Sequence, residues 1–96
     1  MPSLFVIQGR DQGKRFELTK PVLRVGRDKS NSIQLHDTEV SRRHAEVQCR
    51  EDSVYLVDLD SSNGSWVDGV QVNQPVPLSD GSQIRIGSWL NACAGV

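Results

Sequence analysis

Apolar and polar residues alternate in short stretches along most of the chain, and turn residues interrupt the alternation at close intervals. Residues 4–7 and 14–19 form the first two stretches, and the segment GRDQG between them is typical of a hairpin turn. Further stretches of this kind lie at 22–25, 33–35, 45–49, 54–59, 66–67, 70–72, 84–86 and 89–96, the last expected as an edge strand. A period of two predicts half-buried strands, and the 3.6-residue period of a helix is almost absent. The pattern therefore predicts an all-β fold of many short strands, either a sandwich or a barrel.

The length of 96 residues favours one domain over residues 1–96, large enough for a single core. Phe5, Phe16 and Tyr55 lie in strand patterns, and we expect them in that core. No apolar run approaches the roughly 18 residues of a membrane span, and the N-terminus does not read as a signal peptide. One disulfide between Cys49 and Cys93 is possible, but two reduced, buried thiols are favoured. We therefore expect a cytoplasmic (intracellular) protein with no membrane partner.

The net charge of −1 is unevenly distributed. Residues 1–50 hold 10 Lys and Arg against 6 Asp and Glu, a net of +4, whereas residues 51–96 hold 1 against 6, a net of −5. This balance argues against a uniformly basic nucleic-acid binder. A base-stacking barrel would also need exposed aromatic residues, and only Trp66 and Trp89 lie outside the core patterns. A local basic site for one anionic group stays open.

Three turns carry polar side chains that strand connections do not require. Gly26-Arg27 ends one predicted strand, Ser41-Arg42-Arg43-His44 begins another, and Ser61–Ser65 joins two more. Their guanidinium, hydroxyl and carboxamide groups bind anions and clamp peptide backbones. Loops at one end of a sandwich cluster in space although they are distant in sequence, so we expect these three turns to form a binding site.

Ser41 lies three residues before His44, which raises the alternative of a Ser/His hydrolase. A nucleophile needs its base within hydrogen-bond reach and a third, orienting group. On an extended chain, residues i and i+3 point to opposite faces, and the sequence contains no nucleophile elbow. We therefore expect no enzyme, no catalytic residues, no metal and no cofactor.

The motifs Gly26-Arg27, Ser41-x-x-His44 and Ser62-Asn63-Gly64, in this order and spacing, resemble those of a forkhead-associated (FHA) domain. The later Asp68-Gly69 and Asp80-Gly81-x-x-Ile84-x-Ile86-Gly87 extend the resemblance over nearly the whole chain. It implies an all-β fold, a two-sheet β-sandwich of mostly antiparallel short strands. It also implies a non-catalytic module whose loops at one end bind a phosphothreonine-containing protein or peptide, the substrate of a Ser/Thr kinase. Ser65 and Asp68 depart from the usual Thr and Asn of the family, which concerns loop rigidity more than the phosphate.

The resemblance also implies a role for each matching residue. Arg27, Ser41 and Arg42 would contact the phosphate, Ser62 would flank the phosphothreonine, and Asn63 would bond the peptide main chain. His44 would brace the binding loops. Gly26 and Gly64 would allow the backbone conformation of the loops and would not contact the ligand. Arg43 should point away from the ligand if strand alternation holds at this point.

Several questions stay open at the level of sequence. An FHA-like domain that binds a protein independently of phosphorylation is the alternative function, although Arg27, Ser41 and Asn63 are all present. Selectivity around the phosphothreonine is not determined, and Glu39 and the 28–32 loop are the candidates for it. The partner, the kinase and the oligomeric state are likewise not specified by the sequence.

Overall fold

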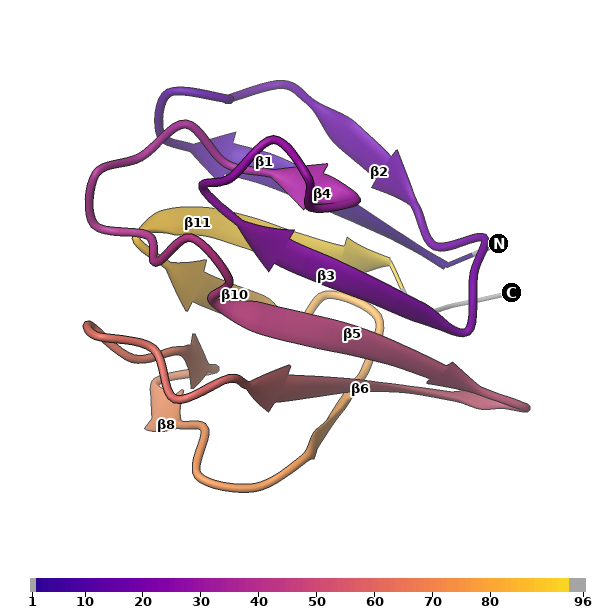
Figure 1. Cartoon of the computed structure of the whole chain (residues 1–96). Helices are drawn as coiled ribbons and strands as arrows, with labels where there is room; N and C mark the ends of the chain where they lie inside the picture. The colour runs from indigo at the N-terminus through magenta and orange to yellow at the C-terminus, as the bar shows by residue number, and fades with distance from the viewer. Residues whose placement is uncertain (1, 94–96) are drawn as a thin grey trace.

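The computed structural model describes residues 2–93 and contains two packed sheets, with no helix in that range (Figure 1). The first sheet has the spatial order β2 (Arg15–Glu17), β1 (Ser3–Gln8), β11 (Ser88–Cys93), β10 (Gln83–Ile86), β7 (Trp66–Val67) and β8 (Val70–Gln71). The second has the order β4 (Ile33–Gln34), β3 (Val22–Gly26), β5 (Ala45–Arg50), β6 (Ser53–Asp58) and β9 (Val76–Leu78). All of the specified strand registers are antiparallel except that of β3 with β4. The predicted β-sandwich is confirmed.

The core forms where the inward faces of the two sheets meet. Alternate residues of each strand contribute to it, as a two-residue period requires. Its fully buried members include Leu4, Val6, Val25, Val47, Leu56, Ile84, Ile86 and Leu90. No helix in the described part of the chain is long and apolar enough to cross a membrane.

The aromatic residues differ from the sequence prediction. Phe5 is 40% exposed, because Leu4 and Val6 occupy the inward positions of β1 and so turn Phe5 to the outer face. Tyr55 is half-buried on the outer face of β6, where the guanidinium of Arg50 stacks 5.0 Å from the ring centroid. Phe16 packs partly against the core. The placement of Phe5 and Tyr55 in the core was therefore wrong.

The sequence predicted that the last strand lies at the edge of its sheet, but this strand is central. β11 lies between β1 and β10, and residues 94–96 of the predicted 89–96 segment lie outside the described part. The register pairs Ser3 with Cys93, so the two described ends of the chain lie side by side. Cys49 is a free thiol on β5, while the side chain of Cys93 is not among those described.

β9 was missed in the sequence because Pro75 and Pro77 interrupt its pattern. Proline cannot donate a ladder hydrogen bond, which confines it to edge strands, and β9 is the edge next to β6. At the C-terminal end of β6, the connection to β7 lies near the connections β3–β4 and β4–β5 (Figure 1). The β1–β2 and β10–β11 turns lie at this same end. The three polar turns singled out in the sequence therefore meet in space.

Candidate functional site

His44 joins two of the three turns from the inside. Its side chain has no exposed surface. The backbone N–H of Ser41 donates to Nδ1 at 3.1 Å, and Nε2 lies 2.8 Å from the carbonyl oxygen of Gly64. Since Nδ1 accepts a hydrogen bond, the proton of the ring is on Nε2, which donates to Gly64. This arrangement is the brace that was expected of His44.

The ring of His44 is neutral. Burial lowers its pKa below the ordinary 6.5, against the opposing effects of the Gly64 carbonyl and the Asp58 carboxylate. Asp58 Oδ1 lies 3.9 Å from Nε2, which would be an ion pair only if the ring were charged. We interpret this contact as a weak attraction because the hydrogen bond from Ser41 requires a lone pair on Nδ1.

The geometry also excludes His44 as a base for Ser41. Both ring nitrogens are engaged with backbone groups, and the Ser41 hydroxyl oxygen instead accepts a hydrogen bond from the N–H of Ser62 at 3.1 Å. The reason given from sequence was partly wrong. Residues 41–44 form a loop that precedes β5, so strand alternation does not apply and the histidine ring turns back toward Ser41. For the same reason Arg42 and Arg43 are both exposed, and alternation does not separate their roles.

Arg27 follows β3 directly and is held against the loop that contains Ser41. Its backbone N–H donates to the carbonyl of Ser41 at 3.0 Å, and its Nε donates to the carbonyl of Val40 at 3.2 Å. These bonds orient the guanidinium and leave its two terminal nitrogens without a protein acceptor in residues 2–93. The hydroxyl hydrogen of Ser41 is likewise available, since its oxygen acts as an acceptor toward Ser62.

The backbone of Arg42 is fixed by two residues of the neighbouring strand and turn. A Cβ atom at Gly26 would come 2.1 Å from the Arg42 carbonyl oxygen, so only glycine permits this approach. The buried side chain of Asn31 donates to the same carbonyl at 2.6 Å and to the Asp28 carbonyl at 2.7 Å. Arg42 itself is exposed, so a rigid backbone presents a solvated guanidinium.

Asp58 organises the third turn, and sequence reasoning missed it. Its carboxylate accepts hydrogen bonds from the Ser61 N–H at 3.0 Å, from the Ser61 hydroxyl at 2.6 Å and from the buried Ser65 hydroxyl at 2.6 Å. Burial opposes ionisation, but these bonds outweigh it and lower the pKa of Asp58 below 3.8. Asp and Ser are turn residues whose side chains hydrogen-bond nearby backbone, and this could have indicated the role of Asp58.

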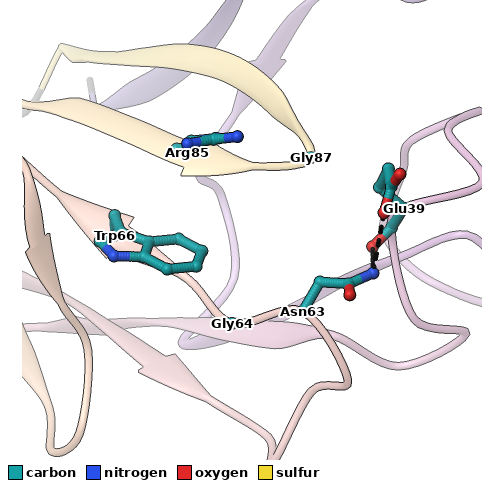
Figure 2. A pocket seen from close by; sticks show the side chains of 6 residues that line it. All are labelled: Glu39, Asn63, Gly64, Trp66, Arg85 and Gly87. Carbon is teal, nitrogen blue, oxygen red and sulfur yellow. Dashed lines mark hydrogen bonds between the residues drawn. The ribbon is translucent and has the colours of Figure 1, made fainter.

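Asn63 and Glu39 form a direct link between the third turn and the loop just before Ser41 (Figure 2). The side-chain amide of Asn63 donates to the Glu39 carbonyl oxygen at 2.8 Å and to its carboxylate at 3.1 Å. The amide nitrogen of Asn63 thus donates to two acceptors within the protein, while its side-chain oxygen has no donor in residues 2–93. Bonding a peptide in both directions, as expected from a carboxamide, would require an exchange of the Glu39 contacts.

A pocket of about 320 Å³ continues from this link onto the six-stranded sheet. Its lining consists of Glu39, Asn63, Gly64, Trp66, Arg85 and Gly87, and Figure 2 shows Arg85 and Trp66 on the wall opposite the Glu39–Asn63 pair. The guanidinium of Arg85 lies between two indole rings, 5.6 Å from Trp66 and 5.5 Å from Trp89. Gly64 has a φ of +86°, and a Cβ there would meet the Trp66 ring at 2.9 Å.

The expected site residues are therefore gathered at one end of the sandwich. Arg27, Ser41, Arg42 and Ser62 carry exposed or half-exposed polar groups there, whereas His44, Gly26 and Gly64 lie beneath or between them. No group of three or more His, Cys, Asp or Glu side chains within residues 2–93 is arranged to hold a metal ion. The contact of the expected site residues with a ligand stays a prediction.

The FHA domain family model matches residues 23–87, and the chain belongs to this family. It is 40% identical over 86 residues to the oxoglutarate dehydrogenase inhibitor of Corynebacterium diphtheriae, covering 90% of this chain and 59% of that protein. It is 36% identical over 86 residues to the glycogen accumulation regulator GarA of Mycobacterium tuberculosis, covering 90% and 52%. The chain thus spans little more than half the length of these relatives.

Solved FHA domains have the same architecture. The FHA domain of the CT664 protein from Chlamydia trachomatis superposes with a TM-score of 0.91 at 26% identity, over 99% of this chain and 98% of that one. A structure from a study of phosphothreonine-dependent FHA domain interactions gives a TM-score of 0.85 at 31% identity, over 96% and 94%. The resemblance deduced from the sequence motifs is confirmed at the level of family and fold.

Proposed function

We propose that residues 1–96 act as a single non-catalytic module that recognises phosphothreonine in a protein or peptide and mediates phosphorylation-dependent protein–protein interaction. The partner is a Ser/Thr kinase substrate, and we place the module inside the cell, where such kinases act and a free thiol such as Cys49 persists. One observation carries the proposal: Arg27, Ser41 and Arg42 point polar groups outward from loops whose backbones are bonded to one another.

The charge of the site suits a phosphate. Arg27, Arg42 and Arg43 form no salt bridge with a carboxylate in residues 2–93. A phosphorylated side chain carries about −1.5 to −2 charges near neutral pH and offers three strong acceptor oxygens. The guanidinium of Arg27 supplies a fork of donors, the Ser41 hydroxyl supplies one more, and Arg42 completes the cage from the adjacent backbone position.

The magnitude is sufficient for reversible signalling. A hydrogen bond to a charged group contributes about 1.5–3 kcal/mol net. Three or four such bonds, less an ordering cost of several kcal/mol, correspond to micromolar affinity, or about −8 kcal/mol. The oxygen of Asn63 fixes the peptide main chain next to the phosphate, and Ser62 packs beside the phosphothreonine. The pocket bounded by Trp66 and Arg85 takes a further side chain of the peptide and contributes to sequence preference.

Fluorescence anisotropy with one peptide library in three forms tests this function: phosphothreonine, phosphoserine and unphosphorylated threonine. Wild-type protein is expected to bind the phosphothreonine form preferentially. Arg27→Ala and Ser41→Ala should each weaken that binding by roughly 10- to 150-fold, the equivalent of one lost charge-assisted bond. Arg24→Ala is the matched control, because Arg24 is an exposed arginine within β3, the strand that Arg27 follows.

Equal binding of the three libraries, with both variants indistinguishable from Arg24→Ala, would contradict the proposal. That result would support the alternative of a partner recognised independently of phosphorylation. Circular dichroism of each variant ensures that a loss of binding is not a loss of fold.

A further inference from the structure

A second pocket adjoins Arg27 and has no role in the function proposed above. Its volume is about 190 Å³, and it is lined by Arg10, Arg27, His36, Asp37 and Thr38. These residues come from three connections: Arg10 from the β1–β2 turn, Arg27 from the turn after β3, and residues 36–38 from the loop that leads to β5. The pocket thus lies at the binding end of the sandwich and shares one arginine with the phosphate site.

The walls of this pocket are fixed by a buried carboxylate. Asp11, which is only 4% exposed, accepts hydrogen bonds from the backbone N–H of His36 at 2.6 Å and from its Nδ1 at 2.7 Å. The ammonium group of Lys14 lies 3.4 Å from the same carboxylate. Burial opposes ionisation of Asp11, but the bonds from His36 outweigh it and lower the pKa of this carboxyl below 3.8. The β1–β2 turn, which carries Arg10, is therefore held against the loop that carries His36.

The contact with Asp11 also orients the His36 ring. A carboxylate can only accept, so Nδ1 carries a proton and donates to it. Nε2 has no hydrogen-bond partner in residues 2–93, and the His36 side chain is 48% exposed. His36 therefore lines the pocket, and its contact with Asp11 fixes the orientation of its ring.

The charges in the pocket favour an anion. Arg10 and Arg27 form no salt bridge with any carboxylate in residues 2–93. One acid, Asp37, also lines the pocket, but both of its oxygens accept hydrogen bonds from the protein: from the Glu39 N–H at 2.9 Å and from the Ser88 hydroxyl at 3.1 Å. Two arginines and one carboxylate therefore line the pocket, which gives it a net positive charge.

We propose that this pocket binds a second anionic group of the same phosphopeptide, with Arg10 as its main ligand and Arg27 shared between the two anions. The inference rests on the proposed function and deepens it by naming a class of ligand: a phosphothreonine peptide that carries another phosphate or carboxylate nearby. Arginine suits both groups because its planar fork pairs with either in a bidentate manner. Thr38 and His36 provide further polar atoms around the same position.

Binding assays with peptides of one sequence test this inference. One peptide carries phosphothreonine among neutral residues, a second adds a glutamate, and a third adds a second phosphate, each moved through successive positions on either side. Wild-type protein is expected to gain about tenfold or more in affinity when the added anion reaches the pocket. Arg10→Ala should abolish this gain and leave the affinity for the neutral-flanked peptide within about twofold, less than half a kcal/mol.

Arg24→Ala is again the matched control and should preserve the gain, since it removes an equal charge elsewhere on the surface. All proteins are compared at one ionic strength, because non-specific attraction is screened by salt. A gain with both added groups identifies a carboxylate as sufficient, whereas a gain with the second phosphate alone identifies a doubly phosphorylated ligand.

Two results would overturn the inference while the proposed function stands. They are phosphothreonine-dependent binding without any gain from the second anion, and a gain that persists undiminished in Arg10→Ala. Failure of every phosphopeptide to bind would overturn the proposed function and this inference together.

Discussion

Both nitrogens of the buried His44 ring are hydrogen-bonded to backbone groups of two different loops, so this side chain cannot take up a proton without breaking a contact. Protonation of Nδ1 would turn the N–H of Ser41 from a donor partner into a repulsive neighbour. The position of Ser41, a proposed phosphate contact, therefore depends on the protonation state of His44, which is buried beneath the site.

Lowering the pH from about 7.5 to about 5 is expected to reduce the free energy of unfolding. Burial lowers the pKa of His44 in the folded chain below 6.5, so the unfolded chain binds the proton more readily. The stability that depends on the neutral ring is fully present above pH 6.5 and is lost as the pH falls toward the folded pKa. Urea unfolding at the two pH values measures the difference.

Two comparisons make this pH prediction specific to His44. His44→Gln removes the titrating ring and should flatten the dependence of stability on pH in this range. Asp11 and Asp58 have lowered pKa values, so their stabilising effect is lost only as the pH falls below about 3.8, outside the range tested. Equal stability of the wild type at both pH values would contradict the prediction.

Single residues also show where sequence reasoning stops. The motif spacing was sufficient to assign Arg27, Ser41 and His44 to one cluster, and the structure brings them together. The role of Asp58 was not recognised because a carboxylate at the end of a strand looks like an ordinary solvated charge. Only the folded turn shows that three hydrogen bonds from Ser61 and Ser65 converge on it.

Among the elements, the strands position the loops through close backbone contact. Where β3 ends, the chain passes so near the second turn that the Arg42 carbonyl occupies the space of a Gly26 side chain. Alternation predicted most strands but neither β9, which prolines conceal, nor the loop conformation of residues 41–44. Hydrogen bonds to distant segments fix that loop, and no local pattern encodes such bonds.

Gly26→Ala is expected to lower stability by about 1–3 kcal/mol and phosphopeptide affinity by roughly tenfold or more, because the added methyl group displaces the backbone of Arg42. Gly81→Ala is the control: its φ of +87° carries a strain of about 1–2 kcal/mol, but nothing lies within 4 Å of the new Cβ. Denaturant unfolding and peptide titration compare the two. The interpretation fails if both variants bind peptide as well as the wild type.

At the scale of the whole molecule, the order of strands was not accessible from the sequence. The pairing of β1 with β11 joins segments at opposite ends of the chain, and alternation within one strand does not specify its partner. The uneven charge was equally uninformative about shape. The excess of basic residues in the first half does correspond to a feature of the binding end. Arg10, Arg27, Arg42 and Arg43 gather there, and none of them forms a salt bridge with a carboxylate in residues 2–93.

A chain truncated after Gly87, where the family match ends, is expected not to fold. The truncation removes β11 from the middle of its sheet and leaves β1 and β10 without their common neighbour. It also deletes Leu90, a fully buried side chain that contributes about 1.5–3 kcal/mol, out of a total stability of roughly 5–15 kcal/mol. Far-ultraviolet circular dichroism and thermal melting compare it with the full chain, and a cooperative transition in the truncated form would refute the expectation.

The pairing of Ser3 with Cys93 has a further consequence for reach. The described ends of the chain lie together on the side away from the binding loops, and the longest dimension of the molecule is 32 Å (Figure 1). An extended chain advances at most about 3.3–3.6 Å per residue, so roughly ten residues are needed to travel that length. A phosphothreonine on a tail of the same polypeptide could reach the site only if at least about ten residues separate it from the end of the domain. The length of such a tail therefore determines whether the site can bind its own chain or only a phosphothreonine on another molecule.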